Sequence, residues 1–141
     1  MTAKKKEPRG IRNNNPLNIR KGSTWLGERP HQTDPAFEEF ISMEYGIRAA
    51  LKLMRNHISG FNGSRKPANT LRKLINVWAP PTENATLKYL DFVSGRTGVL
   101  PSQILHIQDK KNLLAICRAM AFVECGVWLD EEKFESAWSL L

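Results

Sequence analysis

Apolar residues recur every three or four positions through most of the chain after residue 41. The first such segment begins at Ser42, a suitable N-cap, and places Glu44 in the first turn, where a negative charge suits the helix dipole. Its apolar stripe consists of Ile47, Ala50, Leu51, Met54 and Ile58. This spacing predicts a helix that buries one face, followed by a loop over residues 60–67, where glycine, asparagine and serine cluster.

Three shorter helical segments are expected between residues 70 and 107. The first begins at Thr70, which can cap it, and is ended by Pro80 and Pro81. The second covers residues 84–94, and the third is a short helix that starts near Pro101. The residues expected to pack inward are Leu71, Leu74, Ile75, Trp78, Leu90, Val93, Ile104, Leu105 and Ile107.

The last part of the chain contains the most apolar helical segment, over residues 109–125. Gly126 is a good helix stop, and a final helix is expected over residues 130–140. The residues expected to pack inward are Leu113, Ile116, Cys117, Met120, Val123, Phe134, Ala137, Trp138 and Leu141. The pattern therefore predicts a mostly α domain of five or six helices.

Residues 9–41 lack helical spacing and are interrupted by glycine and proline, which favour turns. Short extended pieces are expected at residues 17–20 and 37–41, as a small hairpin or an irregular lobe. Residues 1–8 are expected to form a disordered basic tail. Residues 9–141 are long enough for a single domain with its own core.

The formal net charge of +7 in 141 residues favours a polyanionic partner. Nucleic acid, an anionic membrane surface and an anionic cell-wall polymer all fit, and charge alone does not choose among them. No apolar run reaches the roughly 18 residues of a membrane span. The basic N-terminus has no apolar segment after it, so we expect no signal peptide.

The two cysteines, Cys117 and Cys125, are eight positions apart in one apolar segment. On a helix they would lie about 12 Å apart, which is too far for a disulfide. We interpret both as reduced thiols of the core. The alternative is a metal site, but His31, His57 and His106 have no ligand spacing with them, so we expect neither a metal nor an organic cofactor.

Glu124 is the residue that best fits acid chemistry. It continues the stripe formed by Leu113, Cys117 and Met120, and it stands at the C-terminal end of its helix. Partial burial and the helix dipole would both raise the pKa of its carboxyl group, as a general acid requires. In the alternative interpretation, Glu124 lies at the edge of the stripe and reaches solvent or an arginine.

The segment WAPPTENATLKY, residues 78–89, carries groups that could bind sugars. Trp78 and Tyr89 offer flat apolar faces, while Asn84 and Thr86 offer hydrogen bonds for hydroxyl and N-acetyl groups. The alternative makes Trp78 a core anchor and the residues after Thr82 an ordinary helix start.

Two other acidic residues open helices. Glu44 follows a strand-like piece, and its position at a helix N-terminus favours the ionised form, which suits a base or an electrostatic stabiliser. Glu83 stands just before the helix predicted over residues 84–94. In the alternative, Glu44 is simply a first-turn glutamate that favours its helix.

Several of these motifs together resemble a known family. They are RGIRNNNPLNIR, Trp25, FEEFISMEYGIRAAL, WAPPTENATLKY, the Thr97–Gly98 pair and the final Glu124-Cys125-Gly126. The combination is similar to small phage and prophage lytic proteins of the lysozyme-like superfamily, many of which are virion-associated, and it covers about residues 9–126. The resemblance implies a mostly α lysozyme-like fold that acts on peptidoglycan.

The segment NNNPLNIR is also similar to the asparagine-rich strand that lines the glycan cleft of cell-wall glucosaminidases. In those enzymes the catalytic glutamate ends a helix just before this strand, whereas here the acid upstream is Glu7, in a lysine-rich tail. The matching helix end occurs instead at Glu124. We therefore hypothesise a circular permutation, in which the N-terminal lobe folds back beside Glu124 and Asn14 and Asn15 line the cleft. The competing interpretation gives the asparagines a turn role alone.

The resemblance implies a peptidoglycan glycosidase, of muramidase or lytic transglycosylase type. Glu124 would protonate the glycosidic oxygen, and Glu44 or Glu83 would stabilise positive charge or activate water. One alternative is a non-catalytic virion or wall-binding protein. The other is a nucleic-acid-binding module, for which no helix carries an evident basic stripe.

The expected partners are bacterial peptidoglycan and other virion proteins, with no specific nucleic acid and no membrane span. We expect the chain to be made in the host cytoplasm or carried in a virion, and to act at the bacterial cell wall. The sequence leaves open which bond is cleaved.

Overall fold

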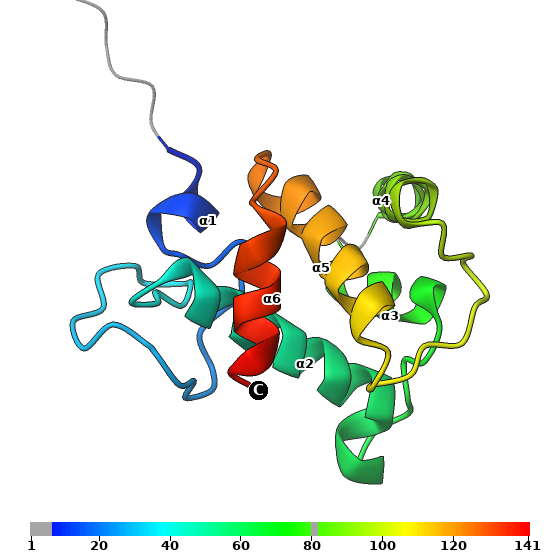
Figure 1. Ribbon diagram of the computed structural model, residues 1–141, viewed down its shortest axis with the longest axis horizontal. Helices are drawn as coiled ribbons and strands as arrows, with labels where there is room; N and C mark the ends of the chain where they lie inside the picture. Colours follow the sequence, from blue (N-terminus) through cyan, green and yellow to red (C-terminus); the bar gives the residue numbers. More distant parts are fainter. Residues whose placement is uncertain (1–6, 80–81) are drawn as a thin grey trace, which may run out of the picture.

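The computed structural model describes residues 7–79 and 82–141. It is mostly helical, as predicted (Figure 1). The helices of the described residues are α1 (Arg9–Arg12), α2 (Met43–Gly63), α3 (Leu71–Trp78), α4 (Glu83–Thr97), α5 (Lys110–Cys125) and α6 (Glu131–Ser139). The prediction of a basic tail falls mainly on residues 1–6, and that of a proline stop on Pro80 and Pro81. Both groups lie outside the described residues.

Side chains at two of the predicted caps account for the starts of α2 and α3. Ser42 and Thr70 accept hydrogen bonds from the main-chain N–H groups of Tyr45 (3.4 Å) and Lys73 (3.2 Å). These bonds satisfy donors that have no partner inside the helix. At the other ends, Gly98 stops α4 in the left-handed conformation that favours glycine. Gly126 stops α5 in the same way.

Helix α5 lies at the centre of the molecule and contacts α1, α2, α4 and α6 (Figure 1). It is buried on more than one face, which explains why its sequence is apolar over most of its circumference. Its buried residues are Leu113, Leu114, Ile116, Cys117, Ala119, Met120, Ala121 and Cys125. Both cysteines are free and buried, so the prediction of core thiols is confirmed.

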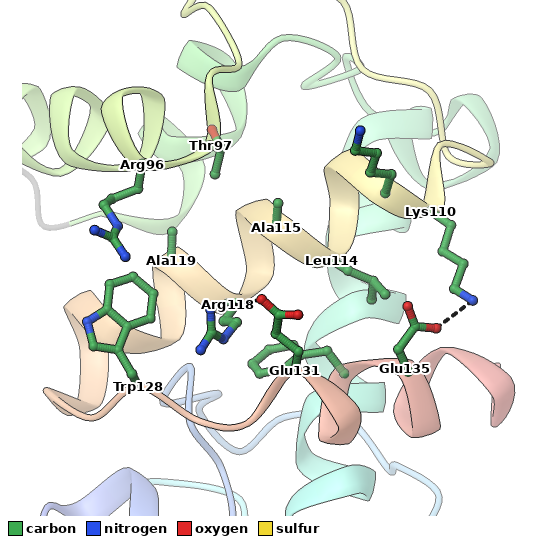
Figure 2. Close-up of a pocket in the computed structure, with 12 residues that line it drawn as sticks. Arg96, Thr97, Lys110, Leu114, Ala115, Arg118, Ala119, Trp128, Glu131 and Glu135 are labelled. Carbon is green, nitrogen blue, oxygen red and sulfur yellow. Dashed lines mark hydrogen bonds and ion pairs between the residues drawn. The ribbon is translucent and has the colours of Figure 1, made fainter.

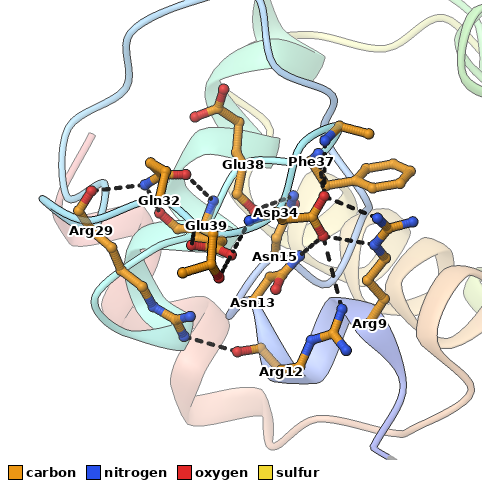
Figure 3. Close-up of polar contacts among 12 residues, drawn as sticks. Arg9, Arg12, Asn13, Asn15, Arg29, Gln32, Asp34, Phe37, Glu38 and Glu39 are labelled. Carbon is orange, nitrogen blue, oxygen red and sulfur yellow. Dashed lines mark hydrogen bonds and ion pairs between the residues drawn. The ribbon is translucent and has the colours of Figure 1, made fainter.

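A buried polar network holds the irregular lobe between α1 and α2 together (Figure 3). The Asp34 carboxylate accepts hydrogen bonds from the Arg9 guanidinium (2.7 and 3.0 Å) and from the Asn13 side-chain amide (2.9 Å). It also accepts bonds from the main-chain N–H groups of Ala36 and Phe37. The Arg9 guanidinium is the main reason that the pKa of Asp34 lies well below its usual range, despite burial.

The lobe also buries two neighbouring glutamates with opposite properties. Burial favours a raised pKa for Glu39, but hydrogen bonds from Thr33 and the main-chain N–H of Asp34 outweigh it and lower the pKa. For Glu38, burial and a hydrogen bond with Glu28 raise the pKa to about 7, against the opposing charge of a nearby lysine. Glu38 therefore lowers the stability of the lobe as pH rises from the ordinary glutamate value of 4.5 to about 7.

Several expectations about the elements are wrong. The segment after Pro101 forms turns instead of a short helix. Ile104 is exposed, and its main chain forms an isolated bridge with Thr70. The N-terminal lobe is irregular, which is one of the two forms expected for it: residues 17–20 and 37–41 meet in the isolated bridge between Arg20 and Phe37, and no sheet forms among the described residues. Val123 and Leu141 are 38% and 37% exposed. Val123 lines a surface groove between α4 and α5 instead of packing into the core.

Candidate functional site

Glu124 stands in the last turn of α5, one residue before the helix ends at Cys125. Its side chain is partly buried, and this burial raises the pKa of the carboxyl group above its ordinary value. The nearby Asn18 amide and Tyr89 hydroxyl oppose the rise without cancelling it. Glu124 thus has the environment of a carboxylic acid that resists ionisation.

Glu124 lines a surface groove of about 510 Å³ between α4 and α5. Helix α4 contributes Ala85, Lys88, Tyr89 and Phe92 to the groove, and α5 contributes Val123 and Glu124. Among the described residues that line it, Glu124 is the one acid. The groove therefore combines an apolar floor with a single proton donor and one lysine.

The Tyr89 hydroxyl is buried and has no hydrogen-bond partner of good geometry among the described residues. The side chain is only 4% exposed, and burial, followed by the charge of Glu124, raises its pKa well above the usual range. The hydroxyl and the Glu124 carboxyl lie close enough for each to shift the pKa of the other. A buried hydroxyl without a partner is costly, and a bound ligand could supply the missing bond.

The N-terminal lobe reaches this end of α5. The Asn18 side-chain amide donates to the main-chain carbonyl of Glu124 (3.3 Å). The Trp78 indole N–H, at the end of α3, donates to the carbonyl of Leu17 (3.3 Å). The N-terminal lobe therefore contacts Glu124 through Asn18, as the hypothesis of a folded-back lobe requires, and it contacts α3 through Leu17.

Asn14 and Asn15, which we expected to line the cleft, have internal roles. Asn15 is fully buried, and its side chain bonds the N–H and C=O of Ile19 and the C=O of Glu38. Asn14 adopts a left-handed backbone (φ 52°) and donates to the carbonyl of Phe40. Their amides hold the lobe in shape, so neither is free to bind a ligand in this conformation.

The other two candidate acids do not join Glu124 in the groove. Glu44 forms an ion pair with Lys133 of α6 (3.3 Å), and this pair joins α2 to α6. Glu83 is exposed in the first turn of α4, and Asn84 beside it is exposed as well. Thr86 donates to the main-chain carbonyl of Thr82, whose own side chain makes no capping bond. Of the predicted sugar-binding residues, Tyr89 lines the groove and Trp78 contacts the adjoining loop.

Sequence reasoning did not single out three residues of this site: Asn18, Phe92 and Val123. Asn18 has a left-handed backbone (φ 53°), for which asparagine is a favoured residue, so the run of asparagines was a usable signal. Val123 was expected to pack into the core, and Phe92 was assigned no role. Their exposure depends on how α4 crosses α5, which a single sequence does not reveal.

No group of three histidine, cysteine, aspartate or glutamate side chains in the described residues is placed to hold a metal ion. None of the helices described is long and apolar enough to cross a bilayer. The chemistry that the groove itself offers is proton transfer by one partly buried carboxyl group next to a buried hydroxyl.

The fold and the groove define a mostly helical protein with a single protected acid at the end of its central helix. No protein-family model matches the chain. Over 122 residues it is 37% identical to Protein P5 of Pseudoalteromonas phage PM2, a match that covers 84% of this chain and 71% of P5. The chain therefore belongs to the family of this phage protein.

Proposed function

We propose that the chain is a phage enzyme that cleaves the glycan backbone of bacterial peptidoglycan, on a lysozyme-like fold whose order along the chain is circularly permuted. The observation that carries the proposal is the partly buried Glu124, which lines a groove together with Tyr89, whose buried hydroxyl lies close to it. Its raised pKa suits a group that must be protonated before it reacts. The contact between Asn18 and Glu124 supports the permuted arrangement.

In this proposal Glu124 donates its proton to the glycosidic oxygen while the bond from that oxygen to the sugar C1 breaks. Tyr89 would donate to a sugar hydroxyl or N-acetyl oxygen. Two-carboxylate mechanisms need a second acid across the scissile bond, and the described lining of the groove provides none. This favours lytic transglycosylation, in which the Glu124 carboxylate then takes the proton of the C6 hydroxyl as that oxygen bonds to C1.

The first test replaces the acid while keeping its shape. Glu124→Gln should lower the rate of cell-wall clearing roughly 10²- to 10⁴-fold, because the amide cannot donate a proton to the leaving oxygen. The matched control is Glu132→Gln, at an exposed glutamate of α6, which should clear at the wild-type rate. Undiminished clearing by Glu124→Gln would contradict the assignment.

Folding is not expected to limit Glu124→Gln. Because the pKa of Glu124 is raised in the folded state, ionisation weakens folding as pH rises above the ordinary glutamate range. The neutral amide lacks this penalty, so the melting temperature of Glu124→Gln at neutral pH should equal or exceed that of the wild type.

A second candidate function is wall binding without cleavage, by a virion structural protein. The observation that favours it is again the lack of a second carboxyl group among the described residues of the groove. Sedimentation with purified peptidoglycan distinguishes the two, because a binding protein would pellet with the wall and release no soluble fragments.

A further inference from the structure

A second hollow, of about 600 Å³, lies where α4, α5 and α6 meet (Figure 2). Figure 2 shows Arg96 and Thr97 of α4 on one side of α5, and Glu131 and Glu135 of α6 on the other. Its floor is made of small and apolar side chains of α5, including Ala115 and Ala119. This hollow, which we call the basic groove, plays no part in the proton chemistry proposed for Glu124.

The charges around the basic groove do not balance. Four cationic side chains line it, namely Arg96, Lys110, Lys111 and Arg118, against two glutamates. Lys110 pairs with Glu135 (2.6 Å) and Arg118 with Glu131 (3.5 Å). Arg96 and Lys111 have no carboxylate partner among the described residues, so two positive charges remain for a ligand.

An aromatic row connects the basic groove to the groove of Glu124. Trp128 lines the basic groove and stacks on Phe122 (ring centroids 4.4 Å apart, 14° between planes). Phe122 stacks in turn on Phe92 (5.5 Å, 22°), which lines the groove of Glu124. The guanidinium carbon of Arg96 lies 4.6 Å from the centre of the Trp128 ring, which holds its charge at the groove.

We infer that the basic groove binds the peptide stem of a peptidoglycan strand whose glycan lies at Glu124. This inference rests on the proposed function. A stem peptide combines free carboxylates with alanine methyl groups, which match unpaired cations above a floor of small apolar side chains. A stem peptide of a few extended residues, at about 3.3 Å each, is long enough to run along the aromatic row from the groove of Glu124 to the basic groove.

The test measures binding of a free stem peptide, so it does not depend on cleavage. A synthetic stem tetrapeptide with free carboxylates is titrated into the full chain, and binding is followed by calorimetry and by the NMR signal of the Trp128 indole N–H. The double variant Arg96→Gln/Lys111→Gln should weaken binding at least about fivefold, as expected for the loss of two partly exposed ion pairs. Added salt should weaken wild-type binding in the same direction.

The matched control is Arg72→Gln/Lys73→Gln, which removes one arginine and one lysine from the exposed start of α3 and should bind as the wild type does. Glu124→Gln should also bind the peptide normally. An acidic L-peptide of the same length and charge is titrated as a comparison. If the chain binds it as tightly as it binds the stem tetrapeptide, the assignment is overturned and the occupant is an acidic protein segment.

The results for binding and for cleavage are separable. Cleavage of peptidoglycan without measurable stem-peptide binding would overturn this inference and leave the proposed function standing. The opposite result is also possible to distinguish. If the wild type binds the stem peptide, Arg96→Gln/Lys111→Gln does not, and the wild type cleaves no glycan, the basic groove is supported and the proposed cleavage is overturned.

Discussion

At the scale of single residues, the asparagines of the N-terminal segment divide between two physical roles. Asn13 and Asn15 are buried and use their side-chain amides to bridge parts of the lobe. Asn14 and Asn18 take left-handed backbone conformations, which cost asparagine less than most other residues. Asn18 alone also contacts the end of α5, so one position of the motif belongs both to the turn and to the candidate site.

Gly46 explains the close fit between this segment and α2. A Cβ atom at Gly46 would collide with the main-chain carbonyl of Asn14. We predict that Gly46→Ala lowers the free energy of unfolding by about 3 kcal/mol, because the backbone it meets cannot easily move. The control is Gly95→Ala in α4, where a Cβ atom meets nothing within 4 Å. This substitution should raise the free energy of unfolding by about 0.5–1 kcal/mol, because alanine favours a helix more than glycine does. Urea unfolding of both variants measures the difference, and equal stabilities would refute this explanation.

Tyr89 allows stability and activity to be separated. Tyr89→Phe removes a buried hydroxyl that makes no well-formed hydrogen bond and should raise the free energy of unfolding by up to about 1 kcal/mol. The hydroxyl also lowers the pKa of Glu124, so its loss should move the alkaline limb of the pH–activity profile to higher pH. The profile is measured as clearing rate against pH. A stabilised variant whose alkaline limb does not move would show that Tyr89 acts on folding alone.

At the scale of elements, the lobe between α1 and α2 depends on Asp34. Its pKa in the folded chain lies below the ordinary value of 3.8, so the network stabilises the fold fully above that pH and loses this contribution as pH falls below it. Asp34→Asn should cost about 2–4 kcal/mol at neutral pH, because the Arg9 guanidinium loses its charged partner.

Melting temperatures measured from pH 2 to pH 7 provide the test. The gap between wild type and Asp34→Asn should narrow as the pH falls below about 4, as protonation removes the same charge from the wild type. The control is Asp91→Asn, at an exposed position of α4. A gap that stays constant with pH would mean that the Asp34 charge has no part in stabilising the lobe.

The sequence predicted the elements wherever local signals decide them. The start of α2 at Ser42, the start of α3 at Thr70 and the stop at Gly126 follow from capping chemistry, which depends on neighbours in the chain. The prediction of a helix after Pro101 was wrong because the main chain there pairs with the start of α3, at Thr70 and Asn69, which the local apolar spacing does not reveal. The polar network around Asp34 was equally out of reach, because it joins residues up to 25 positions apart.

At the scale of the whole molecule, Glu124 was predictable as a candidate because it is an acidic residue at a position that continues an apolar stripe, which the sequence spacing alone reveals. Its groove was not, since that depends on how α4 crosses α5 and leaves Phe92 and Val123 at the surface. The same limit applies to Glu44, whose first-turn position was correct but whose partner, Lys133, lies 89 residues away.

The account depends most on the claim that Glu124 cleaves glycan by donating a proton. Mass spectrometry of fragments released from purified peptidoglycan tests this most directly. We predict that the wild type releases disaccharide-peptides ending in anhydro-muramic acid, and that Glu124→Gln releases almost none. Fragments cut only within the peptide stems, or glycan fragments released equally by Glu124→Gln, would contradict it.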